Sequence, residues 1–114
     1  MKHLESQLQI NCVKYFRLQY PTVLIFAIPN GGSRNIITAS ILKREGVISG
    51  IPDLFIAHGT IFCNGLFIEM KQGKGKLTDN QTEVIKKLRE NNYKVEVCYS
   101  FDEFKIIVDE YLNH

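Results

Sequence analysis

Two acidic residues and a lysine are spaced so that they could share one catalytic patch. Asp53 follows a proline, and Glu69 and Lys71 are separated by one residue at the end of the apolar stretch 66–71. Side chains alternate between the two faces of a β-strand, so Glu69 and Lys71 are expected on the same face. If Asp53 lies on the neighbouring strand of a hairpin, its carboxylate comes close to that of Glu69.

Such a cluster has two interpretations. Burying charges in an apolar strand costs several kcal/mol unless they are paired or bind a metal. Two carboxylates suit Mg²⁺, which would activate water and stabilise the transition state of phosphodiester hydrolysis, while Lys71 orients the water or neutralises the phosphate. Alternatively, Glu69 and Lys71 form an ion pair and Asp53 caps a turn. The spacing alone does not separate these interpretations.

The elements that would position these residues follow the order α-β-α-β-β-α-β-α. Helical periodicity and turn residues predict helices at 4–18, 33–43, 77–91 and 102–112, the second of them capped by Ser33 and ending near Gly46. Strands are predicted at 23–28, buried on both faces, and at 51–57, 66–71 and 94–99. The second and third strands are expected to form a hairpin. The expected fold class is α/β, with a mixed sheet of about four strands flanked by helices.

The bulk composition indicates one soluble intracellular domain spanning 1–114. The chain has 114 residues, of which 45% are hydrophobic and 23% charged. It contains neither an apolar run of about 20 residues nor a signal-peptide stretch at its start, so we expect a cytoplasmic protein without a membrane partner. Its three dispersed cysteines argue against a disulfide framework or a CxxC zinc site.

Positive charge is concentrated near the candidate cluster. The formal net charge of +2 is small, yet residues 71–94 contain seven basic and three acidic residues. Such an excess would steer a phosphodiester substrate, although a solvated helix face has the same composition.

The motifs resemble those of a known nuclease family. Pro52-Asp53 followed by Glu69-Met70-Lys71 is similar to the signature of the PD-(D/E)XK nucleases. The surroundings resemble the virus-type replication-repair nuclease domain, VRR-NUC, in five blocks that run in order along the chain. These blocks are an early helical Glu5, the turn 29–32 followed by Arg34, and the stretches 50–54, 65–71 and 77–81. The resemblance covers essentially the whole chain and implies a restriction-endonuclease-like core.

The resemblance also implies roles for individual residues. Asp53 and Glu69 correspond to metal-binding carboxylates that take Mg²⁺ or Mn²⁺, with the backbone carbonyl of Met70 as a further ligand. Lys71 corresponds to the catalytic lysine. Glu5 would complete the acidic cluster and contact the metal, and Gln81 would approach the same site.

Two of these residues have structural alternatives. Glu5 borders an apolar helical stripe, where a solvated glutamate is common. Thr78-x-x-Gln81 fits a capping box, in which the Gln81 side chain returns to the start of its own helix. Because Gln81 also begins an inward-facing stripe, both of its roles remain open.

Two glycine-containing segments are candidates for DNA contact. Ser33 and Arg34 follow the turn 29–32, where glycines let a phosphate approach the backbone. Lys74 and Lys76 alternate with glycines in a flexible basic loop. That loop lacks the Gly-Lys-Ser/Thr ending of a P-loop, so no nucleotide cofactor is expected.

These observations predict a divalent-metal-dependent, structure-selective DNA endonuclease of phage or mobile-element replication or repair. Stand-alone members of the family resemble Holliday-junction resolvases and act as homodimers, which would place two active sites on a four-way junction. The alternatives are a nuclease that cuts flaps or forks, and a DNA-binding module without cleavage activity.

Overall fold

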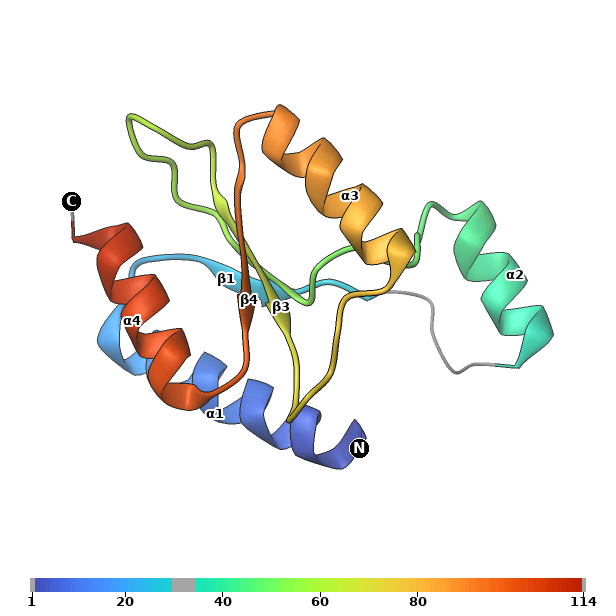
Figure 1. Cartoon of the computed structure of the whole chain (residues 1–114), viewed down its shortest axis with the longest axis horizontal. Helices are drawn as coiled ribbons and strands as arrows, with labels where there is room; N and C mark the ends of the chain where they lie inside the picture. The colour runs from blue at the N-terminus through green and yellow to red at the C-terminus, as the bar shows by residue number, and fades with distance from the viewer. Residues whose placement is uncertain (1, 30–34, 114) are drawn as a thin grey trace.

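The computed structural model describes residues 2–29 and 35–113, which form a mixed four-stranded sheet with helices on both faces (Figure 1). The elements follow the predicted order: α1 (Lys2–Gln19), β1 (Ile25–Ala27), α2 (Ile36–Arg44), β2 (Leu54–Ile56), β3 (Leu66–Met70), α3 (Asp79–Glu90), β4 (Lys94–Cys98) and α4 (Phe101–Leu112). The predicted α/β class and mixed sheet are confirmed.

The sheet has the strand order β1-β2-β3-β4. The strands β1, β2 and β3 pair antiparallel, and β4 runs parallel to β3 after the crossover through α3. The expected hairpin is therefore present, with β2 and β3 as its strands. Its register pairs Leu54 with Ile68.

Alternation along β3 divides its side chains between two cores. Leu66, Ile68 and Met70 pack in the main core with residues of α1 and α4. Phe67 faces the opposite side, in a smaller cluster with Ile85 of α3. Glu69 shares the α3 side with Phe67, so β3 carries an acidic residue toward the first turn of that helix.

The structure corrects the prediction for the first strand. Residues 23–28 were expected to be buried on both faces, but β1 contains three residues and lies at an edge of the sheet. Ile25 is buried, whereas Phe26 is 40% exposed. The run of β-branched and aromatic residues thus indicates strand propensity without burial on both faces.

The N-cap of α2 was also predicted incorrectly. Ser33 lies outside the described residues, and the helix begins two positions later than a Ser33 cap requires. The side chain of Asn35 accepts the capping hydrogen bond from the Thr38 amide. In Figure 1, α2 stands apart from the sheet, and none of its residues is buried.

No helix in the described ranges is both long and apolar enough to cross a membrane.

Candidate active site

Asp53 lies immediately before β2, directly beside the end of β3. Its backbone oxygen accepts a 2.9 Å hydrogen bond from the Ile28 amide, which ties it to the segment that follows β1. Its side-chain Oδ2 accepts a 2.7 Å hydrogen bond from the Met70 amide. Because the hairpin register pairs Leu54 with Ile68, the preceding residue Asp53 falls opposite Glu69. The expected approach of the two carboxylates is therefore present.

Glu69 and Lys71 emerge from the same face of β3. Glu69 is only 4% exposed and is the buried charged residue of the described structure. The Nζ atom of Lys71 lies 3.7 Å from Glu69 Oε2, and the lysine side chain is 12% exposed. The lysine thus contributes positive charge beside the carboxylates from a mostly buried side chain.

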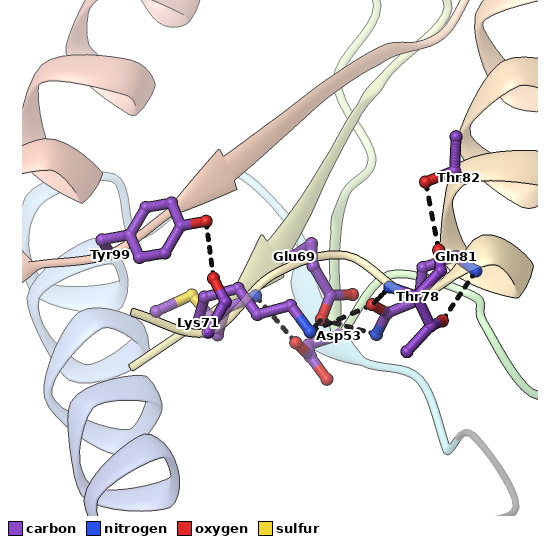
Figure 2. Close-up of polar contacts among 9 residues, drawn as sticks. Asp53, Glu69, Lys71, Thr78, Gln81, Thr82 and Tyr99 are labelled. Carbon is purple, nitrogen blue, oxygen red and sulfur yellow. Dashed lines mark hydrogen bonds and ion pairs between the residues drawn. The ribbon is translucent and has the colours of Figure 1, made fainter. Parts of the chain in front are cut away.

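Gln81 connects the first turn of α3 to this cluster (Figure 2). Its Oε1 accepts hydrogen bonds of 3.0 Å from both Lys71 Nζ and the Thr78 amide. Its Nε2 donates to Glu69 Oε2 at 3.1 Å. The Thr78 hydroxyl completes a capping box by accepting from the Gln81 amide. The Gln81 side chain therefore does both things that the sequence allowed. It caps its own helix, and it is hydrogen-bonded to two members of the cluster.

Lys71 balances the negative charge of the two carboxylates only in part. Burial raises the pKa of Glu69 from its ordinary value of 4.5 to about 8, and the neighbouring Asp53 carboxylate adds to this effect while Lys71 opposes it. Burial also raises the pKa of Asp53, against the hydrogen bond from the Met70 amide, which lowers it. When all three side chains are ionised, the cluster carries a net charge of −1 in a desolvated place.

This donor set fits a hard divalent cation. Mg²⁺ and Mn²⁺ bind carboxylate oxygens, and Mg²⁺ commonly takes one or two carboxylates and completes its shell with water and substrate oxygens. Asp53 and Glu69 supply two such groups, and a bound cation would offset the burial and the neighbouring negative charge that raise both pKa values. In the described ranges, no group of three Asp, Glu, His or Cys residues is assembled that could enclose a metal.

Glu5 is the predicted residue that the structure does not bring into the cluster. It lies in the first turn of α1 and is partly exposed. It does raise the pKa values of Asp53 and Glu69, although more weakly than burial does. Glu5 is thus near enough to act through its charge, whereas direct metal contact by Glu5 remains a prediction.

The basic loop after β3 is fixed in part by a residue that the sequence did not suggest. Tyr99 is 38% exposed, and its hydroxyl donates a 2.9 Å hydrogen bond to the backbone oxygen of Gly75. This bond anchors the loop that carries the exposed Lys74 and Lys76 next to Lys71. The available signal was that Tyr99 is the last residue of the predicted strand 94–99, at the same end of the sheet as Lys71. The other two DNA-binding candidates, Ser33 and Arg34, lie outside the described residues.

Comparisons with known proteins agree with this geometry. The family description of the VRR-NUC domain matches residues 2–102. The fold is similar to the solved structure of a VRR_NUC domain protein, with a TM-score of 0.79 and 25% sequence identity over 96% of this chain and 88% of that chain. No functionally curated protein matches the sequence.

Proposed function

This chain belongs to the VRR-NUC domain family of PD-(D/E)XK-type nucleases, and on that premise we propose that it hydrolyses phosphodiester bonds in DNA with the help of Mg²⁺ or Mn²⁺. The observation that carries the proposal is the cluster at the end of β3. A buried carboxylate (Glu69) and a partly buried one (Asp53) lie beside a lysine, and a glutamine of α3 is hydrogen-bonded to both Glu69 and Lys71. A purely structural ion pair requires neither the second carboxylate nor the glutamine.

Each residue of the cluster has a proposed role. Asp53 and Glu69 would hold the cation, with the Met70 backbone carbonyl as a further ligand, and the bound cation would supply an activated water and offset charge on the phosphate. The Met70 amide orients the Asp53 carboxylate through its 2.7 Å hydrogen bond. Lys71 directs its ammonium group toward the scissile phosphate or the attacking water. Gln81 keeps Lys71 from collapsing fully onto Glu69, because it accepts a hydrogen bond from the ammonium group at 3.0 Å.

A plasmid-nicking assay tests this proposal. Wild type is expected to nick supercoiled DNA with Mg²⁺ or Mn²⁺ and to lose activity with a chelator. Asp53→Ala and Lys71→Ala are expected to lower the rate by at least about 100-fold, the scale of a lost metal ligand or charge-stabilising group. Equal nicking by all three proteins would point to a contaminating nuclease and remove the catalytic assignment.

The surface ion pair between Lys94 and Glu96 offers a matched control. These residues lie on β4 with their charged atoms 3.1 Å apart, and both side chains are at least a third exposed. Changing Glu96→Gln or Lys94→Met removes the same charge types as changes in the cluster. Nicking by these variants should remain within about twofold of wild type, since exposed ion pairs contribute little.

The finer proposal is a homodimer that prefers four-way DNA junctions, acting in the cytoplasm during phage or mobile-element replication or repair. The family resemblance supports it, and a two-fold dimer would present two equivalent sites to a two-fold junction. Sedimentation and a substrate panel of four-way, flap, fork and nicked DNA test it. A monomer that cuts flaps fastest would refute the junction version and favour the flap-type alternative. DNA binding without cleavage under any divalent cation would favour the binding module.

A further inference from the structure

A cleft of about 440 Å³ separates the projecting helix α2 from α3. Its apolar wall is formed by Ala39 of α2, by Val47 in the segment that follows α2, and by Val84 of α3. Lys43 of α2 and Lys87 of α3 line the same cleft from its two sides. The helical spacing explains this arrangement, because Ala39 and Lys43 are four residues apart on α2, and Val84 and Lys87 are three apart on α3.

The positive charges of Lys43 and Lys87 are not paired with acidic side chains in the described chain. Both lysines are exposed, and no carboxylate of the described chain lies within 4.0 Å of either ammonium group. None of the residues that line the cleft is acidic. Glu83 of α3 lies four residues before Lys87 on the same helix, yet neither it nor Glu90 lines the cleft or forms an ion pair with Lys87. Two cations that face one hollow from different elements suit a polyanion better than a neutral or basic ligand.

The cleft is joined to the catalytic cluster by two short segments. Asn80 Nδ2 donates a 2.6 Å hydrogen bond to Ser49 Oγ. This bond ties the segment between α2 and β2 to the first turn of α3. Gly50 has a φ of +87°, and a side chain there would come within 3.0 Å of Asn80. This close packing fixes the position of the segment that leads to Asp53.

The separation between cleft and cluster matches a few nucleotides. Ser49 precedes Asp53 by four residues, which span at most about 14 Å. Asn80 directly precedes Gln81, which contacts Glu69 and Lys71. A DNA strand advances about 3.4 Å per nucleotide along the helix axis, so a phosphate in the cleft would lie within about four nucleotides of the scissile one.

We propose that the cleft between α2 and α3 binds the sugar-phosphate backbone of the DNA substrate on one side of the cleavage site. Lys43 and Lys87 contact backbone phosphates, and the apolar wall faces the sugars. This inference rests on the proposed nuclease function and adds a substrate-binding segment that lies outside the catalytic cluster. It also assigns a role to α2, which buries no side chain in the described structure.

The test compares the salt dependence of DNA binding. Affinities of wild type and Lys43→Ala/Lys87→Ala are measured by fluorescence anisotropy on a labelled duplex, with Ca²⁺ replacing Mg²⁺ and a gel to check that the duplex remains intact. Each lost phosphate contact should lower the slope of log affinity against log salt by about 0.9, so the double variant should lose about 1.8. Its defect should then be about 12-fold larger at 50 mM than at 200 mM salt.

Two further variants separate a local contact from a change in net charge. Lys14→Ala/Lys94→Ala removes two exposed lysines from α1 and from the end of β4 remote from the cluster. It should retain the wild-type slope. Lys43→Arg/Lys87→Arg should restore binding, because arginine also contacts phosphates. Circular dichroism and thermal melting verify folding, which the exposed positions of both cleft lysines favour.

The outcomes distinguish this inference from the proposed function. If wild type nicks DNA but Lys43→Ala/Lys87→Ala binds with the slope of the control variant, the cleft assignment is wrong and the nuclease function stands. If wild type binds DNA through these lysines but never cleaves, the nuclease function fails and the cleft assignment stands. If the double variant changes only the oligomeric state in sedimentation, the cleft is a protein interface and the inference is overturned.

Discussion

Replacing Glu69 with glutamine should stabilise the metal-free protein at alkaline pH. The folded protein retains a proton on Glu69 up to a pKa of about 8, whereas an ordinary glutamate has a value of 4.5. Between these values the folded state binds more protons than the unfolded chain, so the free energy of unfolding falls as the pH rises from about 4.5 to about 8. Glutamine has the same shape and no charge to desolvate.

The magnitude follows from the difference in pKa. One pH unit corresponds to about 1.4 kcal/mol, which gives about 5 kcal/mol if the site stays rigid. Because Lys71 lies beside Glu69 and is partly exposed, water can enter and reduce this penalty, so we expect about 2–4 kcal/mol. That is a substantial part of the roughly 5–15 kcal/mol that holds a typical domain folded. In a domain of this size it corresponds to about 10 °C in melting temperature.

Thermal and urea denaturation at pH 5 and pH 9, with EDTA present, measure the effect. Glu69→Gln should exceed wild type in stability at pH 9, and the two proteins should converge at pH 5. Adding Mg²⁺ should stabilise wild type at pH 9, by about 2.7 kcal/mol at 100 times the dissociation constant, and leave Glu69→Gln nearly unchanged. Glu96→Gln, at a partly exposed position, should change stability little at either pH.

The refuting result is specific. If wild type and Glu69→Gln keep the same stability difference from pH 5 to pH 9, the burial of Glu69 does not disfavour its charge. The carboxylate pair would then have no electrostatic need for a bound cation.

Further predictions concern the supports of the site. Gln81→Ala should lower the nicking rate more than about tenfold, because Lys71 loses its acceptor, whereas Thr78→Ala should cost about 1 kcal/mol of stability in urea denaturation and retain most activity. Gly50→Ala should destabilise the fold by about 2 kcal/mol or more, whereas Gly46→Ala, also at positive φ but with open space around it, should cost less, as thermal melting would show. Tyr99→Phe should cost at most about 1.5 kcal/mol and accelerate amide hydrogen exchange in residues 72–76, because the bond to the loop is lost. An unchanged exchange rate there would contradict the anchoring role.

The parts of the site that depend on local rules were predictable from the sequence. Strand alternation placed Glu69 and Lys71 on one face, and turn residues between the strands indicated the hairpin that brings Asp53 opposite Glu69. The Thr78-x-x-Gln81 spacing correctly predicted the capping box. In each case the relevant contact lies within one element or across one hairpin, so a short stretch of sequence determines it.

Features set by tertiary packing were harder to predict from the sequence. Strand propensity at 23–28 does not reveal that β1 forms an edge of the sheet, because edge position depends on the order of all strands. Similarly, the exposure of Tyr99 depends on a hydrogen bond to Gly75 across the end of the sheet. The distance from Glu5 to the carboxylate pair depends on how α1 crosses the sheet, which its helical periodicity does not specify.

The double use of Gln81 has a consequence for the dynamics of the enzyme. The same oxygen accepts hydrogen bonds from the Thr78 amide and from Lys71, so fraying of the first turn of α3 also releases the lysine. Helix ends open locally at a lower free energy than the whole domain unfolds. Activity should therefore decline on warming at temperatures where the sheet and main core are still intact. On the proposed function, we expect one helical turn, rather than the stability of the whole fold, to set the thermal limit of catalysis.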